Sequence, residues 1–382
     1  MIYVSAWALQ LLFFLNGDAR AFSSGTCNDT DSHVFFYTLN SNNSPRGVGA
    51  IIKKVMKKLF LLLAMLTAMV LTAGAQSMQV ATLSHEGTIT SYTSADALRQ
   101  AYEAAVDGDV ITLSSGVFNS VNLEKRITVR GAGMGVKVND SDPYIEPTII
   151  KGSFNIITDD SAVHNTILEG VVCKDRVYWG GLGNKTFSKC RFTYLDHHLN
   201  AEVGNPTFIQ CVFDEVHITN NHNGNCNFYS CYMGTCPNTK SIDVMTNCII
   251  NLNPENNGGR LQMEGIVKNS IFIFKEDLIQ YNFIAYNSIF KGPVEDRNRK
   301  AFLDNGNYIL SDDIQLFKEG SFYQLTDDTK TYLGTDGTEV GIYGGTLAFD
   351  PTPTNPQIIK FNVAPKTTLD GKLSIDIEVY AK

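Results

Sequence analysis

The sequence lacks an excess of positive charge. Lys and Arg number 31 against 39 Asp and Glu, which gives a formal net charge of −8. A surface that binds nucleic acid needs a basic excess, so this balance argues against DNA or RNA as a partner. It does not exclude an acidic glycan, because a local basic patch can form on an acidic protein.

Long apolar runs are also scarce. Met56-Lys57-Lys58 forms a basic start, Leu59 to Leu71 is an apolar stretch, and Ala73-Gly74-Ala75 is a small-residue cleavage site. This order is typical of a secretory signal peptide and predicts export to the periplasm, the cell surface or the medium. No apolar run of membrane length follows, so we predict no membrane span in the mature chain, which begins at Gln76.

The signal peptide, residues 56–75, starts far from residue 1. We interpret Met56 as the true start and residues 1–55 as an upstream extension. The alternative makes Ile2–Leu15 a first membrane segment, but this stretch is short against the ~20 residues that a span requires.

A repeat occupies the middle of the chain. Between Thr166 and Phe290, a hydrophobic–x–polar–(Cys/Ser/Gly)–x–hydrophobic pattern recurs about every twenty residues, without a helical period. Such a period predicts a solenoid of β coils that share one core. The register positions are Gly170, Cys190, Cys211, Cys231, Cys248, Ser270 and Ser288.

Four of these register positions are cysteines, in a chain that has 8 Cys. Removing Cys27 with the upstream segment leaves an odd number, so at least one thiol is free or bridges another chain. Stacked coils place these four sulfurs in one column with a spacing of about 4.8 Å. We interpret the column as buried core filling. Asn247, Asn269 and Asn287 precede the register position, as expected for left-handed bends with stacked side chains.

The flanking segments predict an N-terminal cap and a C-terminal β-hairpin, which is either a second cap or the stub of a following domain. In residues 76–106, a predicted strand precedes a helix that Ser94 would cap, with Leu98, Ala101 and Tyr102 on its apolar face. Residues 107–345 form the solenoid, which amounts to about eleven coils at roughly twenty residues each. Residues 346–382 contain Ile358–Val363 and Leu373–Val379, a predicted β-hairpin.

The order of motifs near the start is specific. A helix is followed by Gly108-Asp109-Val110-Ile111-Thr112-Leu113, then Ile127-Thr128-Val129-Arg130-Gly131-Ala132-Gly133 and Thr148-Ile149-Ile150-Lys151-Gly152. This order resembles the opening coils of right-handed parallel β-helix proteins of the pectin-lyase-like class, and Asp336 to Gly345 resembles the closing coil of secreted Bacteroidetes members. The resemblance implies an all-β right-handed parallel β-helix. It implies no single activity, because such solenoids include lyases, hydrolases, adhesins and phage spikes.

Lyases of this class neutralise a uronate with Ca²⁺ or a cationic side chain and remove the adjacent C5 proton. The calcium acids and arginine motif of pectate lyases and the motifs of polygalacturonases have no match here, although calcium stays possible. Counting six residues past the register gives Arg176, Asp196 and His217, which would form one column if the turns are equal. These residues are the catalytic candidates, with a metal site or a chance grouping of loop residues as alternatives.

Other side chains are candidates for ligand binding. Lys189 and Arg191 flank Cys190, so strand alternation turns both outward if the sulfur points inward. Tyr194 offers a ring for sugar stacking. The alternative for all of them is an ordinary solvated face. The full set of binding candidates is His197, His198, Lys189, Arg191, Tyr194, Arg260 and Lys268.

Long regular faces suit an extended polymer better than a compact metabolite. The sequence therefore predicts an exported protein that binds, or cleaves by a lyase reaction, a polysaccharide along one face. The rival hypothesis is a non-catalytic surface or adhesion protein whose solenoid acts as a spacer.

Overall fold

The chain divides into two units, residues 1–75 and 76–382, and the description below concerns the second. The computed structural model describes residues 79–158, 165–197, 204–218, 226–235, 238–239, 242–252, 262–275, 282–294, 303–363, 372 and 375–380. The predicted upstream extension and signal peptide, together with His198 and Arg260, lie outside these residues.

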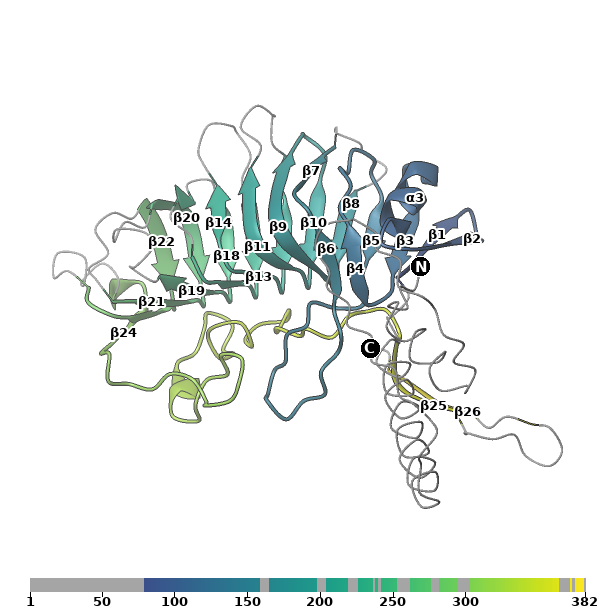
Figure 1. The fold of residues 1–382 in the computed structure, drawn as a ribbon. Coiled ribbons are helices and arrows are strands. Elements are labelled where there is room, and N and C mark those ends of the chain that lie inside the picture. The colour runs from purple at the N-terminus through teal and green to yellow at the C-terminus, as the bar shows by residue number, and fades with distance from the viewer. Residues whose placement is uncertain are drawn as a thin grey trace, which may run out of the picture. The chain divides into compact units, whose positions relative to one another are not determined.

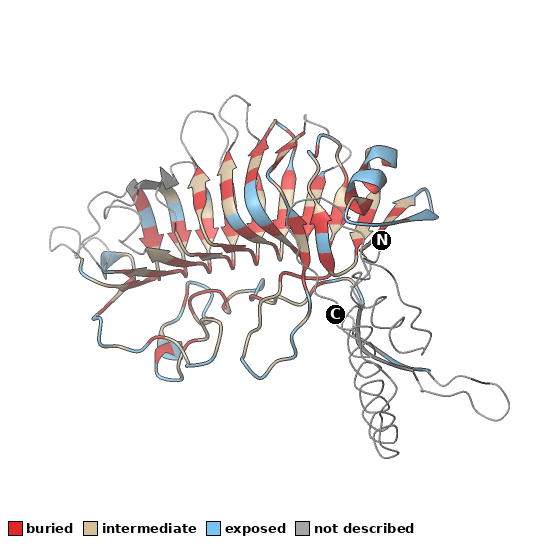
Figure 2. Cartoon of the chain, viewed as in Figure 1, coloured by how far each residue is buried: buried red, intermediate tan, exposed pale blue. Residues whose placement is uncertain are grey.

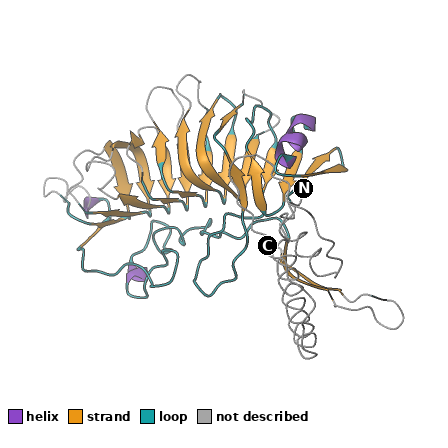
Figure 3. Cartoon of the chain, viewed as in Figure 1, coloured by secondary structure: helices purple, strands orange, loops and turns teal. Residues whose placement is uncertain are grey.

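The second unit is built around a parallel β-solenoid (Figures 1 and 3), which confirms the predicted fold class. In the first sheet, successive strands pair in parallel from β3 to β22. Its strands are β3 (Val110–Leu113), β5 (Thr128–Arg130), β8 (Thr166–Glu169), β10 (Lys185–Ser188), β12 (Thr207–Ile209), β15 (Cys226–Tyr229), β18 (Ile242–Thr246), the end of β20 (Gln262–Lys268) and β22 (Asn282–Tyr286).

A second parallel sheet follows the first, across a sharp corner in the coils from β8 onward. It runs from β4 to β24 and contains the first halves of two long strands, β9 and β11. Its strands are β4 (Gly116–Asn119), β6 (Thr148–Lys151), β9 (Val171–Gly180), β11 (Arg191–His197), β13 (Val212–Phe213), β16 (Tyr232–Met233), β19 (Ile249–Leu252), β21 (Ile271–Phe274), β23 (Ile289–Lys291) and β24 (Tyr308–Leu310).

A third, shorter sheet completes the middle coils. It consists of β7 (Phe154–Ile157), the second halves of β9 and β11, β14 (Val216–Ile218), β17 (Asn238–Thr239) and the start of β20. The described residues thus stack fewer coils than the eleven expected, because the chain leaves the ladder after β24.

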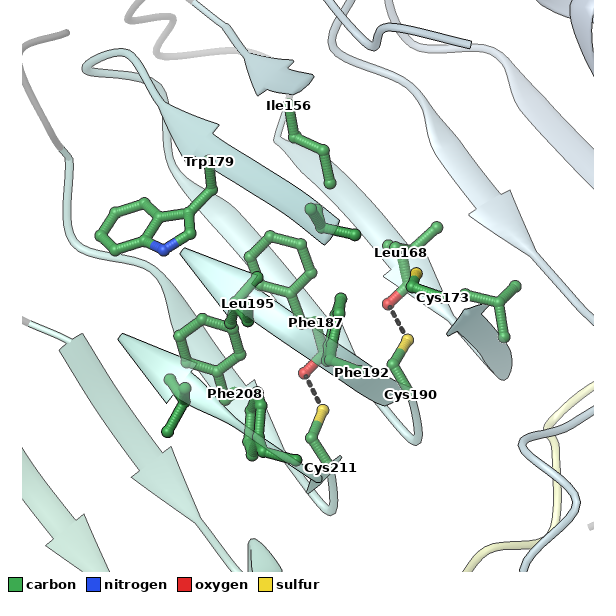
Figure 4. Packing of buried hydrophobic residues seen from close by; sticks show 14 of the residues in the cluster. Ile156, Leu168, Cys173, Trp179, Phe187, Cys190, Phe192, Leu195, Phe208 and Cys211 are labelled. Atoms are coloured by element: carbon green, nitrogen blue, oxygen red, sulfur yellow. Dashed lines mark hydrogen bonds between the residues drawn. The ribbon is translucent and has the colours of Figure 1, made fainter. Parts of the chain in front are cut away.

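The predicted cysteine column lies in the core. Cys190, Cys211, Cys231 and Cys248 are fully buried and free, and burial raises the pKa of the first three thiols. Each sulfur hydrogen-bonds a backbone carbonyl of the preceding coil, for example Cys190 Sγ to Leu168 O at 3.3 Å and Cys211 Sγ to Phe187 O at 3.4 Å (Figure 4).

The same position also accepts hydrogen bonds from the preceding coil. The Cys211 amide donates to Cys231 Sγ at 3.4 Å, the Cys248 amide to Ser270 Oγ at 3.0 Å, and the Ser270 amide to Ser288 Oγ at 3.0 Å. The column is therefore a polar ladder inside an apolar core. Stacked phenylalanines lie beside it, with Phe187 and Phe208 at 4.8 Å and Phe208 and Phe228 at 4.8 Å between ring centres.

The N-terminal end carries the predicted cap. Helix α3 (Ala97–Ala104) buries Leu98, Ala101 and Tyr102, as expected from their spacing. Its N-cap is Asp96 rather than Ser94, whose hydroxyl accepts a hydrogen bond from the Asp96 amide at 3.1 Å. An antiparallel hairpin of β1 (Val80–His85) and β2 (Thr88–Thr93) extends the first sheet beyond β3. At the other end of the chain, β25 (Gln357–Val363) and β26 (Ile375–Tyr380) form the predicted antiparallel hairpin.

The corner between the first and second sheets has a left-handed backbone in successive coils. The predicted Asn247, Asn269 and Asn287 have φ of 54°, 52° and 43°, and Lys189, Gln210 and Ser230 share this conformation. Gly170 is the corresponding corner residue of its coil, with φ of 64°, so it aligns with Lys189 rather than with Cys190. The sequence alignment is therefore off by one residue in this coil, where Val171 takes the buried position.

After β24 the chain returns along these corners (Figure 1). We call residues 335–356 the strap. Its residues meet the corners in reverse order, and hydrogen bonds join the strap to corner side chains or to their neighbours. The pairs are Asn269 with the Thr335 amide at 2.8 Å, Asn247 with Gly341 O at 3.3 Å, Gln210 with Leu347 O at 3.3 Å, Lys189 with Thr352 O at 2.6 Å and Glu169 with the Thr354 hydroxyl at 2.5 Å.

A second apolar cluster lies beneath the strap and the segment before it. Val212, Ile249 and Ile271 point outward from the second sheet and pack against Leu316, Leu325, Val340, Ile342 and Phe349. The burial pattern in Figure 2 follows this arrangement. The outer face of the second sheet is thus covered from β13 to β23, whereas the first and third sheets present side chains outward there.

We predict that the ladder at Cys231 requires a hydrogen-bonding side chain. Cys231→Ser keeps a donor and an acceptor, as at Ser270, whereas Cys231→Val removes both although Val171 shows that valine fits the position. The orphaned Cys211 amide should make the valine variant less stable by about 1–3 kcal/mol. Thermal and urea unfolding followed by circular dichroism measure the difference. Equal stability of both variants would contradict the ladder.

The strap contact at Asn269 gives a second prediction. Asn269→Gly keeps the left-handed backbone and loses the bond to Thr335, so we expect a loss of about 0.5–1.5 kcal/mol. Asn269→Val loses the same bond and adds a strained corner, for a further loss of about 1–3 kcal/mol. Urea unfolding of the two variants separates the two contributions.

Candidate functional site

The third sheet presents a continuous polar face. Along β9, β11 and β14, side chains alternate in direction, with Val177, Leu195 and Val216 buried in the core. The residues between them point outward and are partly or fully exposed. They are Arg176, Tyr178, Tyr194, Asp196 and His217.

Strand pairing arranges the outward residues in rows along the solenoid axis. Asp196 pairs with Tyr178 on one side and with His217 on the other. By strand register, the row extends to Asn155 at one end and to the positions of Asn238 and Gln262 at the other. We call these six register positions the polar row. Each is occupied by a residue that can form hydrogen bonds, with a spacing of about 4.8 Å between neighbouring strands.

Beside the polar row, three side chains form a stack. The Arg176 guanidinium lies 3.8 Å from the centre of the Tyr194 ring, and the His217 ring stacks on Tyr194 at 4.8 Å with an interplanar angle of 20°. Arg176 also donates a hydrogen bond to the Tyr178 hydroxyl at 3.3 Å. Because Tyr194 has a partner on each face, it offers an edge to a ligand. The predicted use of this ring as a sugar-stacking platform therefore does not fit the arrangement.

The electrostatics of the stack fix the protonation of Arg176 and of Tyr194. The hydrogen bond to Tyr178 and the nearby Asp196 raise the pKa of Arg176, which stays cationic. Burial and the charge of Asp196 raise the pKa of Tyr194, which stays a neutral phenol near pH 7. His217 Nε2 hydrogen-bonds Glu215 Oε1 at 2.5 Å, so a carboxylate orients this imidazole.

Arg176 differs from the other arginines in the described part of the chain. Arg126, Arg130 and Arg191 form ion pairs with Asp107, Glu169 and Asp214, and Arg99 lies 4.0 Å from Asp96. Arg176 alone among the described arginines has no carboxylate within ion-pairing distance, and aromatic groups hold it instead. Its charge is therefore positioned but not neutralised.

The three catalytic candidates lie on one face, although not in one column. Asp196 and His217 are direct neighbours in adjacent strands. Arg176 instead pairs with Tyr194, and Tyr178 occupies the position beside Asp196 that was predicted for Arg176. Two causes combine. Gly170 is a corner residue, and a β-bulge sets Lys174 and Asp175 of β9 opposite Thr193 of β11. The assumption of equal turns thus fails for this coil.

The binding candidates other than Tyr194 that the structure describes do not lie together. His197 is buried, with its ring 6.0 Å from Trp179, and Lys189 is a corner residue that binds Thr352 and Asp350 of the strap. Arg191 is engaged with Asp214, and Lys268 lies on the first sheet. These four do not join the polar row. Sequence reasoning missed Asn155, Asn238 and Gln262, because the number of residues between corner and third sheet varies among coils.

A metal centre has no support within the described residues, since no group of three or more His, Cys, Asp or Glu there could hold an ion. Among the same residues, no helix has the length and apolar character to cross a membrane.

The comparisons with known proteins add no family. No protein-family model matches the sequence, and no curated protein or solved structure is significantly similar to it. The resemblance to pectin-lyase-like proteins is therefore supported at the level of the parallel β-solenoid.

Proposed function

We propose that this protein is exported and binds an extended acidic polysaccharide along the polar row. The observation that carries the proposal is Arg176, a cation that aromatic groups hold at the row without a carboxylate partner. Such a guanidinium is available for the carboxylate or sulfate of a ligand.

The polar row supports the same ligand class. Tyr178, Asp196 and His217 repeat along the axis at strand spacing, so a linear polymer can meet the same kind of contact in successive coils. Asp196 accepts hydrogen bonds from hydroxyl groups, and the Tyr178 hydroxyl and the His217 imidazole serve as donor or acceptor. These are the contacts that sugar hydroxyls require.

We predict that Arg176→Ala weakens binding of an acidic glycan by about tenfold, the effect of ~1.4 kcal/mol. Arg191→Ala is the matched control, because this arginine is already paired with Asp214 and should leave binding unchanged. Isothermal titration calorimetry measures the affinity of both variants for polygalacturonate, alginate, heparin and a neutral glucan. An unchanged affinity in Arg176→Ala, or a preference for the neutral glucan, would contradict the proposal.

A lyase reaction is the second candidate, and the pair His217–Glu215 favours it. In this reaction a base takes the C5 proton, the C–H electrons form a C4–C5 double bond, and the C4–oxygen bond breaks as the leaving oxygen gains a proton. His217 is the base candidate because Glu215 orients it and Arg176, on the other face of Tyr194, would face the uronate carboxylate.

We therefore predict that any lyase activity is lost in His217→Gln, while binding of the polymer persists. Ultraviolet absorbance of the unsaturated product follows turnover, and titration follows binding in the same samples. Full activity of this variant would show that His217 is not the base that takes the C5 proton. If the unaltered protein binds the polymer without turnover, the lyase hypothesis is wrong and only the binding function remains.

A further inference from the structure

The N-terminal end of the first sheet finishes in an exposed edge strand. Strand β2 pairs with β1 on one side, and no other strand of the described residues pairs with it. Five of its six residues are exposed, and Ile89 is 71% exposed, the highest value among the large hydrophobic residues of the described chain. The strand is pale blue at the tip of the hairpin in Figure 2.

The hydrogen-bond pattern shows which backbone groups face away from β1. The Ser94 amide bonds Gln79 O at 3.1 Å, and Val80 O accepts from Ser114 of the coil on the far side of β1. In an antiparallel pair, alternate residues direct both N–H and C=O to the same neighbour. Thr88, Thr90 and Tyr92 therefore face β1, and Ile89, Ser91 and Thr93 direct their backbone groups outward.

This edge lacks the usual protection against pairing. Natural edge strands carry a charge, a proline or a bulge, or are very short. Residues Thr88–Thr93 contain no charge and no proline, and the register with β1 is uninterrupted over all six residues. An unprotected edge of this length is a template for another strand.

We propose that the partner is β2 of a second copy of this chain, paired antiparallel about a twofold axis at Ser91. Ser91 then faces its own equivalent, and Ile89 faces Thr93 on both sides, so every outward N–H and C=O of these residues gains a partner. Thr90 faces Tyr92 in the intervening pairs, a β-branched residue against an aromatic ring. No like charges meet within the paired strand.

A second copy brings the same uncharged strand to this edge, so one register satisfies all outward groups and sets no like charges opposite each other within the strand. The contact is small compared with the ~1,600 Å² of a standard interface, so the dimer should be weak and dependent on concentration. It uses the edge of the first sheet, and the polar row belongs to the third. One assembly would then carry two polar rows.

The test is sedimentation velocity of the purified protein over a range of concentrations. We expect a monomer–dimer equilibrium that Ser91→Pro abolishes, because proline removes the outward donor without touching the bonds to β1. Ser91→Lys should weaken the dimer at least tenfold, since it sets two like charges opposite each other. Thr90→Lys is the matched control. It adds the same charge opposite Tyr92, so it should weaken the dimer much less than Ser91→Lys.

Circular dichroism and thermal unfolding show whether each variant keeps the fold, and Ser91→Val, which preserves the backbone bonds, should retain the dimer. A protein that is monomeric at every concentration would overturn the inference. A dimer with equal affinity in Ser91→Lys and Thr90→Lys would overturn it as well. Neither result depends on glycan binding, which is measured separately through Arg176.

Discussion

The structure depends on one constraint that recurs in the coils from Gly170 to Asn287, a left-handed corner followed at once by a small buried residue. The corner turns the chain from the first sheet to the second with φ near 50° at Lys189, Gln210 and Ser230. The next residue then enters the core, where Cys190, Cys211 and Cys231 satisfy backbone groups of the preceding coil. Because turn and ladder occupy adjacent positions, a slip of one residue would lose both, and this fixes the register of the coils.

The same corners determine which faces remain open. A left-handed residue points its side chain away from the core, and Asn269, Gln210 and Lys189 use theirs to hold the strap. Most of these bonds go to backbone atoms of the strap, so the contact depends on its extended path more than on its sequence. With the strap in place, the second sheet is covered, and a ligand can meet the outward residues of the third sheet.

Much of the fold could be predicted, because it repeats. The period, the buried cysteines, the left-handed asparagines, the N-terminal helix and the C-terminal hairpin follow from local patterns that recur or that have strong signals of their own. The strap could not be predicted, since it pairs residues such as Thr352 and Lys189 through contacts that occur once. The site was predicted in part. Asp196 and His217 share a register, but the bulge opposite Thr193 moves Arg176 out of their column, and no sequence pattern marks it.

The stack of Arg176, Tyr194 and His217 suits recognition of charge better than recognition of an apolar sugar face. Both faces of the tyrosine are occupied, so the ring acts as a spacer that orders its neighbours. A carboxylate in the place of Tyr194 would also order the guanidinium, but it would neutralise it. The aromatic ring attracts the cation through its quadrupole and leaves the full charge for a ligand. Ordering without neutralisation is the property that a binding site for anionic groups needs, and it separates Arg176 from the paired arginines elsewhere on the solenoid.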